Sequence, residues 1–259
     1  MCQCPSTHQV LWAVIRKRFG TEKQVLGLMK NSMSKSLTAE FFGTFSLVFA
    51  GTGAIVVNDF SAGAIGHVGI ALTFGLIVMA MIYCLGDISG AHLNPAVTLG
   101  FWFAGRFGGK NVIPYILAQC GGGLFASGLL RGMFPDGGSY GATIPEISAG
   151  SALIFEFILT LILMMTILGV TTGAKEEGVT AALAIGGVVA LEAMFAGPIT
   201  GASMNPARSL GPALVSGQLG DLWVYILGPI LGAVVAFPLC RFSRDSDCCS
   251  GCHAVNRQS

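Results

Sequence analysis

The sequence predicts an all-α integral membrane protein with six transmembrane helices and two re-entrant half-helices, arranged as an inverted repeat of three spans plus three. Three observations lead to this prediction: the composition, the number of long apolar segments, and a motif that occurs twice. Of the 259 residues, 53% are hydrophobic and 10% are charged, against about 25% charged residues in typical soluble domains. With a mean hydropathy of +0.73, a soluble fold of this chain would have too few polar groups to cover its surface.

Six apolar segments are each long enough to cross a bilayer, which takes about 20 mostly apolar residues in a helix. They are residues 39–58, 65–86, 111–134, 152–170, 179–197 and 222–242. The N-terminal segment does not fit a secretory signal, because Arg16, Lys17 and Arg18 interrupt its apolar part. Residues 8–19 fit either a short interfacial helix or a solvated tail.

The basic residues predict how the chain is oriented in the membrane. Six Lys and Arg residues precede residue 36, and three more lie in connections expected on the same side, while the opposite side is nearly free of them. The positive-inside rule therefore places both termini in the cytoplasm. We expect cytoplasmic tails at residues 1–36 and 243–259 and a membrane domain at residues 37–242. The net charge of +1 gives no indication of a nucleic-acid partner.

The membrane domain consists of two similar halves, residues 39–134 and 152–242. Each half begins with a span that contains one acidic residue, Glu40 or Glu156, and continues with a second span, an Asn-Pro-Ala motif and a third span. Because three is an odd number of spans, the two halves have opposite orientations in the membrane. The two Asn-Pro-Ala segments therefore enter from opposite faces and can meet near the midplane.

Both motifs predict the start of a short helix. They are Asn94-Pro95-Ala96 in SGAHLNPAVTLG and Asn205-Pro206-Ala207 in TGASMNPARSLG. Asn is a preferred N-cap, and Pro is tolerated in the first turn, where its missing N–H would have no partner. We expect half-helices at 94 to about 104 and 205 to about 215 that meet N-terminus to N-terminus, where their dipoles oppose a cation. The capping would occupy the Asn oxygens and leave their NH₂ groups free to donate to a neutral molecule.

Paired Asn-Pro-Ala motifs on an inverted repeat of six spans resemble the aquaporin, or major intrinsic protein, family. The resemblance covers residues 39–242 and includes AEFFGT at the start of the first span. It implies a six-helix bundle with one pore in each subunit, usually as a homotetramer, in the cell membrane. It also implies a passive channel for water and small neutral solutes that uses no cofactor and excludes protons and ions.

The resemblance further implies a selectivity constriction of four residues, placed by their offsets from the motifs. They are Phe74, Ala193, Ala202 and Arg208. Strict water channels resemble Phe-His-small-Arg at these positions, and glycerol facilitators resemble Trp-Gly-Phe-Arg followed by Asp, where this chain has Ser209. The stretch AGPITGASMNPARSLGPA looks most like the nodulin-26-like group and its bacterial relatives. This likeness favours water plus glycerol, urea or metalloid hydroxides, with a strict water channel as the alternative.

The charged residues in the membrane domain have more than one interpretation. Arg208 taken alone also fits a side chain that reaches the membrane interface. Glu40 and Glu156 fit either carboxylates that accept backbone N–H groups of the loop in their own half, or protonatable coupling groups of a transporter. Their placement as a symmetric pair favours the first interpretation. Glu192 has no counterpart in the first half, and it fits either the pore mouth or a contact with a neighbouring subunit.

Glycines in the third span of each half predict close helix crossings. They are Gly121, Gly122, Gly123 and Gly128 in the first half and Gly228 and Gly232 in the second.

The C-terminal tail contains a cluster of possible metal ligands, Cys248, Cys249, Cys252 and His253. Thiolates suit a thiophilic metal, but the same segment fits a disordered tail or a lipidation site, so no metal site is predicted. A coupled transporter is a more remote alternative to a channel, because the breaks carry Asn, Pro and Ala in place of ion-coordinating groups. The sequence contains no nucleophile–base pair or phosphate-binding loop that would predict an enzyme.

Overall fold

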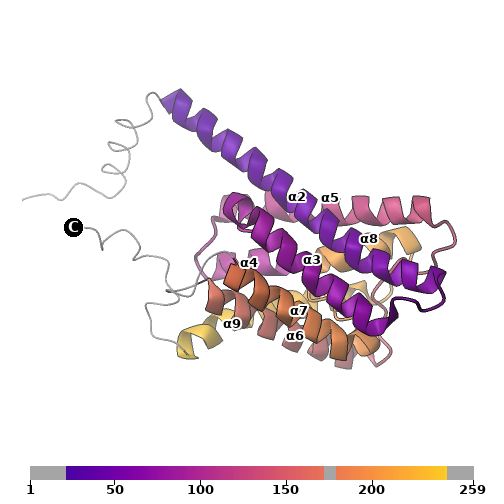
Figure 1. Ribbon diagram of the computed structural model, residues 1–259. Coiled ribbons are helices and arrows are strands. Elements are labelled where there is room, and N and C mark those ends of the chain that lie inside the picture. Colours follow the sequence, from indigo (N-terminus) through magenta and orange to yellow (C-terminus); the bar gives the residue numbers. More distant parts are fainter. Residues whose placement is uncertain (1–21, 172–178, 244–259) are drawn as a thin grey trace, which may run out of the picture.

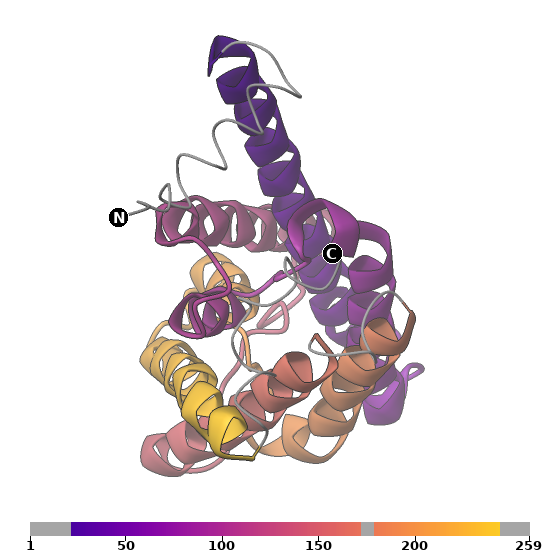
Figure 2. The same ribbon diagram turned by 90° about the vertical axis from the view of Figure 1, so that its left-hand side faces the viewer.

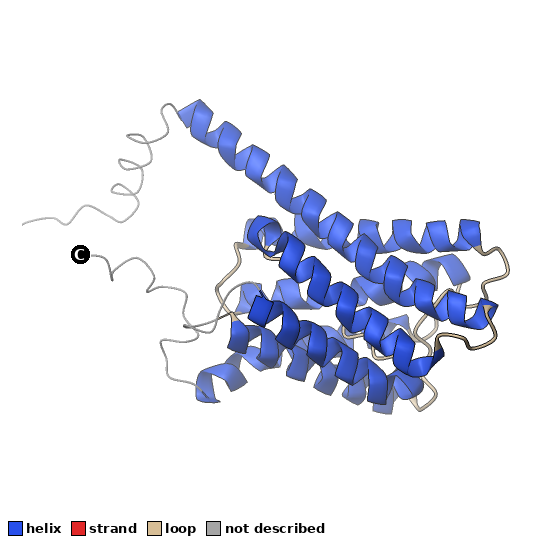
Figure 3. Ribbon diagram, in the orientation of Figure 1, coloured by secondary structure: helices blue, strands red, loops and turns tan. Residues whose placement is uncertain are grey.

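The computed structural model describes residues 22–171 and 179–243, and all regular secondary structure in these two ranges is helical (Figures 1 and 3). The long helices are α2 (Glu22–Phe60), α3 (Gly66–Ser89), α5 (Gly109–Met133), α6 (Ala149–Val170), α7 (Val179–Thr200) and α9 (Leu222–Ser243). The short helices are α4 (Pro95–Phe103) and α8 (Pro206–Ser216). Within the described residues, six helices are long and apolar enough to cross a membrane. The predicted fold class is confirmed.

Helix α2 begins earlier than the sequence predicts. The apolar pattern predicts a span from residue 39, whereas α2 starts at Glu22, and the part that is apolar enough to span a membrane is Met33–Phe60. Residues 22–38 contain no proline and a single glycine, so nothing in the sequence ends the helix at the edge of the apolar segment. Figure 1 shows the N-terminal end of α2 extending away from the bundle.

The two halves interlock through their short helices. In the first half α2 packs against α3 and α5, and in the second half α6 packs against α7 and α9. Each short helix packs mainly against the third span of the other half, α4 against α9 and α8 against α5. Helices α3 and α7 complete the contact between the halves. The six long helices surround a central space, and the two short helices fill the gap between α5 and α9, as the view along the bundle shows (Figure 2).

Two glycines at equivalent positions allow the closest crossings within each half. A Cβ atom on Gly122 of α5 would overlap with the carbonyl oxygen of Phe41 on α2, and one on Gly232 of α9 would overlap with that of Phe157 on α6. Backbones in such close contact bring the third span of each half against the first. At Gly128 the prediction of a close crossing is wrong, because a Cβ atom there would meet open space.

We expect Gly122→Ala to destabilise the fold and Gly128→Ala to leave it unchanged or slightly more stable. The added methyl group at position 122 forces α2 and α5 apart, a change that costs about 1–3 kcal/mol. The same change at position 128 has open space around it and gains helix propensity. Thermal unfolding of the two variants in one detergent measures the difference. Equal losses of stability would show that the close backbone contact at Gly122 is unimportant.

Candidate functional site

The two half-helices begin at the predicted asparagines. The side-chain oxygen of Asn94 accepts the N–H of Ala96 at 2.8 Å. The side-chain oxygen of Asn205 accepts the N–H groups of Ala207 and Arg208 at 3.0 and 3.3 Å. In both helices proline occupies the first position, so the capping that the sequence predicts is present twice.

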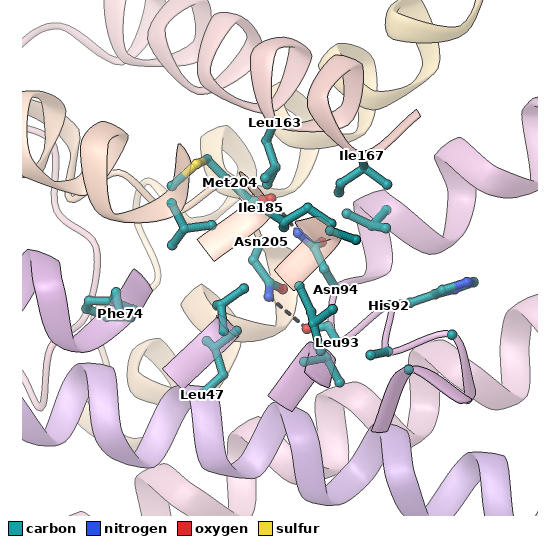
Figure 4. A pocket seen from close by; sticks show the side chains of 18 of the residues that line it. Leu47, Phe74, His92, Leu93, Asn94, Leu163, Ile167, Ile185, Met204 and Asn205 are labelled. Carbon is teal, nitrogen blue, oxygen red and sulfur yellow. Dashed lines mark hydrogen bonds between the residues drawn. The ribbon is translucent and has the colours of Figure 1, made fainter. Parts of the chain in front are cut away.

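The asparagine side chains meet between the two halves, as Figure 4 shows. The Nδ2 group of Asn94 donates to the carbonyl oxygen of Met204 at 2.8 Å, and that of Asn205 donates to the carbonyl oxygen of Leu93 at 2.9 Å. The expectation that both NH₂ groups are free is therefore wrong. Each group uses one of its two hydrogens on the opposite loop, which leaves one hydrogen for the cavity that both side chains line.

The loops that lead into the half-helices have the same unusual backbone in both halves. Positive φ angles occur at Gly90 (85°), Ala91 (44°), Leu93 (52°), Gly201 (85°), Ala202 (41°) and Met204 (53°). A non-glycine residue in this region costs about 1–3 kcal/mol and persists only where its surroundings hold it. Loops of this kind therefore need strong hydrogen bonds from the helices around them.

The carboxylate of Glu40 on α2 provides these bonds in the first half. One oxygen accepts the hydroxyl of Ser89 at 2.7 Å and the N–H of His92 at 2.9 Å. The other oxygen accepts the N–H of Leu93 and the side-chain amide of Gln119, both at 2.7 Å. Glu40 is fully buried, so this is the arrangement that the bracing interpretation requires.

The carboxylate of Glu156 on α6 has the equivalent contacts in the second half. One oxygen accepts the hydroxyl of Thr200 at 2.8 Å and the N–H of Ser203 at 3.0 Å. The other accepts the N–H of Met204 at 2.8 Å. Glu156 is also fully buried, and each acid therefore contacts the loop of its own half.

Two tyrosines that the sequence analysis missed complete these contacts. The hydroxyl of Tyr115 on α5 donates to the carbonyl oxygen of Ser89 at 3.0 Å, and that of Tyr225 on α9 donates to the carbonyl oxygen of Thr200 at 2.6 Å. A signal was present, because Tyr-Ile-Leu occurs in the third span of both halves, at 115–117 and 225–227. The repeat therefore includes the tyrosines that bind the backbone carbonyl at the start of each loop.

A cavity of about 550 Å³ runs past the two asparagines. The four residues expected at the constriction, Phe74, Ala193, Ala202 and Arg208, all line it. Most of the remaining wall is apolar and includes Leu47, Val78, Leu163, Ile167 and Ile185, several of which surround the asparagines in Figure 4. The other motif residues, Pro95, Ala96, Pro206 and Ala207, are buried and do not line the cavity. Polar groups reach the cavity from the two loops and from Arg208, and also from Tyr83 and Asp87 of α3 and Thr171 at the end of α6.

Arg208 lies inside this cavity, in the first turn of α8. It is 2% exposed, and one guanidinium nitrogen donates to the carbonyl oxygen of Gly141 at 2.6 Å. The guanidinium carbon lies 4.9 Å from the ring centroid of Phe74, a distance at which a cation is attracted to an aromatic face. The Nε atom has no hydrogen-bond partner among the residues that the structure describes. The side chain therefore stays at the cavity and does not extend to the membrane interface.

Comparison with known proteins identifies the family. Residues 27–238 match the major intrinsic protein family. The chain belongs to the major intrinsic protein family. Similar relatives include aquaporin NIP1-1 of Zea mays, which is 47% identical over 215 residues covering 81% of this chain and 76% of that protein. Aquaporin NIP1-4 of Oryza sativa subsp. japonica is 46% identical over 233 residues, with 87% and 84% covered.

The fold is also that of a solved member of this family. The aquaglyceroporin from Plasmodium falciparum superposes with a TM-score of 0.72 and 27% sequence identity, over 81% of this chain and 95% of that one. Major intrinsic proteins are channels and not enzymes. This family member is a multi-pass membrane channel for water and small neutral solutes.

A chain of hydroxyl groups lies directly beside Arg208 of the channel. Thr143, in the connection before α6, donates its hydroxyl to that of Ser209 at 2.8 Å. The hydroxyls of Ser209 and Ser203 are 2.5 Å apart, and Ser203 also donates to the carbonyl oxygen of Asn205 at 3.0 Å. Because the carbonyl of Gly141 binds Arg208, the connection before α6 contacts both Arg208 and the residue that follows it.

Glu192 of the channel matches neither of its two predicted environments. Its side chain is fully buried, so it does not lie on the surface that would face a neighbouring subunit, and it does not line the cavity.

The four tail residues proposed as weak metal ligands, Cys248 to His253, lie outside the described residues. Within residues 22–171 and 179–243, no group of three metal-ligating side chains occurs.

We expect Glu40→Gln to destabilise the channel, because an amide NH₂ would face one of the N–H or NH₂ donors that the carboxylate now accepts. A buried donor without an acceptor costs about 1–3 kcal/mol, so thermal unfolding of the variant in detergent should begin at a clearly lower temperature. Glu146→Gln is the matched control, since that acid is exposed and the same change there should have little effect. A Glu40→Gln variant as stable as the wild type would contradict the bracing interpretation.

Proposed function

We propose that this chain is a passive channel that passes water and glycerol-sized neutral solutes, such as glycerol, urea or metalloid hydroxides, and excludes protons and ions. The composition of the constriction supports this proposal. Two of its four residues, Ala193 and Ala202, have the smallest apolar side chains, opposite the Phe74 ring and the Arg208 guanidinium. The opening is therefore wide and has a single strong donor on one side.

The exclusion of cations rests on the electrostatics of the two loops. The N-termini of α4 and α8 meet at the asparagine pair, and each helix contributes about half a positive charge there. Arg208 adds a full positive charge at the constriction. A hydrated proton or a sodium ion is repelled at both places, whereas a neutral solute accepts hydrogen bonds from Arg208 and from the remaining Asn94 and Asn205 hydrogens. The apolar side chains that make up most of the opposite wall offer a cation no ligands.

The bracing role of Glu40 and Glu156 is part of this proposal, and it favours a channel over a coupled transporter. A coupling acid exchanges protons with the passage, whereas these two carboxylates have several donors each and are fully buried. Neither acid lines the cavity. The loops therefore act as fixed structures, which fits passive flux.

For the assembly and orientation of the channel we keep the sequence predictions as proposals. We propose a homotetramer in the cell membrane with a channel domain at residues 37–242 and cytoplasmic tails at 1–36 and 243–259. Large apolar side chains exposed on α2 and α5, among them Phe42, Leu117 and Phe125, are suited to lipid or to a neighbouring subunit. The excess of basic residues before residue 36 supports cytoplasmic termini.

The experiment that tests the proposal is stopped-flow light scattering of proteoliposomes against water, glycerol, urea, arsenite and silicic acid. We expect fast water flux, with vesicles that shrink and then reswell as the neutral solute enters. Vesicles that shrink fast and stay shrunken with every solute would instead identify a strict water channel. Flux that saturates and depends on a sodium or proton gradient would identify a transporter.

We expect Ala193→His to reduce glycerol flux by roughly tenfold or more while water flux is largely kept. The imidazole would fill the side of the constriction that the alanine leaves open, and a few side-chain atoms in such a site discriminate between solutes on this scale. A series of Ala193→Ser, Ala193→Val and Ala193→His should give stepwise decreases, measured by reswelling rates. Glycerol flux that does not depend on the size of residue 193 would show that the constriction lies elsewhere.

We expect Arg208→Val to retain water flux and to raise cation leak by roughly tenfold or more, because the full charge at the constriction is lost. Sodium-dependent currents or dye-reported proton leak in proteoliposomes measure the effect. Arg131→Gln is the control, since this arginine is exposed and does not line the cavity. A leak that rises equally in both variants would show that loss of Arg208 is not its cause.

A further inference from the structure

Helix α7 contains one acidic residue, Glu192, to which the mechanism above assigns no role. Its side chain is fully buried, and neither carboxyl oxygen has a hydrogen-bond partner among the described residues. The other two fully buried acids are different: Glu40 accepts four hydrogen bonds and Glu156 accepts three. Glu192 therefore lacks the donors that stabilise the other two buried carboxylates.

The position of Glu192 on α7 places it next to the constriction. It precedes Ala193, which lines the cavity. Gly186 and Ala190 of α7 face Gly75 of α3, and a residue two positions after Ala190 is rotated by about 200° around the helix. Glu192 thus lies on the side of α7 away from α3. Because α7 packs against α3 and α6, this is the side of α6.

The groups around Glu192 would make a negative charge there unfavourable. Glu156 is the one titratable residue of α6, and its charge lies close enough to interact with that of Glu192. Arg208 is bound to the carbonyl oxygen of Gly141 and lies over the Phe74 ring, and neither it nor any other described residue donates a hydrogen bond to Glu192.

The titratable residues of α3 do not compensate Glu192 either. His67 lies against the carbonyl oxygen of Met194 at 2.7 Å, on the face of α7 opposite Glu192. Tyr83, Cys84 and Asp87 lie nearer the C-terminal end of α3, where Tyr83 and Asp87 line the cavity and Cys84 is exposed. An ionised Glu192 would therefore be an unpaired charge beside a second carboxylate, which is strongly unfavourable in a dry interior. The neutral carboxylic acid is the form that this site accommodates.

Building on the channel function proposed above, we propose that Glu192 is a proton-dependent determinant of charge selectivity. As a neutral acid it leaves the positive field of Arg208 and of the two half-helix termini undiminished. When it loses its proton, a negative charge appears directly behind Ala193, offsets part of that field and weakens the exclusion of cations. Water flux, which does not depend on net charge, stays the same.

The test compares wild-type channel with Glu192→Gln in proteoliposomes, measuring water flux by stopped flow and sodium leak by ion flux as the pH is raised from neutral. Glutamine has the size and neutrality of the protonated acid, so at neutral pH the two proteins should agree in water flux, leak and thermal stability. At alkaline pH the leak of the wild type should rise by about tenfold, the effect of a unit charge at roughly 10 Å in a partly polar medium, while the variant stays constant. Glu146→Gln, which removes an exposed acid, controls for surface charge and should follow the wild type.

Infrared spectroscopy provides a second readout that does not depend on transport. The wild type should show the carbonyl stretch of a protonated carboxylic acid at neutral pH, reduced in Glu192→Gln and lost in the wild type at alkaline pH. A variant that leaks or is unstable at neutral pH would overturn the proposal, because Glu192 would then be ionised and bound to a cation or water. A leak that rises equally in both proteins would overturn it as well. If neither protein conducts water, the result contradicts the proposed channel function and does not bear on Glu192 in particular.

Discussion

A loop that enters a membrane without forming a helix must find partners for its backbone N–H groups inside the protein, because lipid offers none. In this channel two buried carboxylates meet that requirement. Glu40 accepts the N–H groups of His92 and Leu93, and Glu156 accepts those of Ser203 and Met204. The same bonds hold several left-handed residues in place. The short helices, the asparagine pair and the constriction all depend on these two anchors.

The anchored loops also join the two halves. Each asparagine caps its own half-helix and donates to a carbonyl of the opposite loop, and each half-helix packs on the third span of the other half. Movement of one half against the other would break both sets of contacts at once. The centre of the protein is therefore built as a fixed passage, in contrast to the rocking halves of many transporters with inverted repeats.

The constriction combines one strong charge with little steric restriction. Arg208 binds the carbonyl of Gly141 and lies over the Phe74 ring, so its position is set by the connection before α6 as well as by its own helix. Alanines at positions 193 and 202 leave the remaining sides open. In the proposed function, selection against charge and selection by size therefore come from different residues. In the role proposed for Glu192, loss of its proton weakens the exclusion of cations and leaves selection by size unchanged.

Local signals in the sequence determined much of this structure. Apolar length determined the spans, the repeated motif and the odd number of spans determined the inverted topology, and Asn-Pro determined where α4 and α8 begin. The offsets from the motifs, read through a family resemblance, placed Phe74, Ala193, Ala202 and Arg208 on one cavity. These features depend on neighbours in the chain or on repetition, which a single sequence displays directly.

Tertiary structure decided the contacts between segments far apart in the chain. The sequence did not show that the Asn94 and Asn205 amides donate to the carbonyls of Met204 and Leu93. It also did not show that Tyr115 and Tyr225 hold the loops, nor that Glu192 is buried with no hydrogen-bond partner among the described residues. The physical reason is that hydrogen bonds and burial at these sites depend on the distance between crossing helices and on the rotation of each helix about its axis. The spacing of residues along the chain specifies neither.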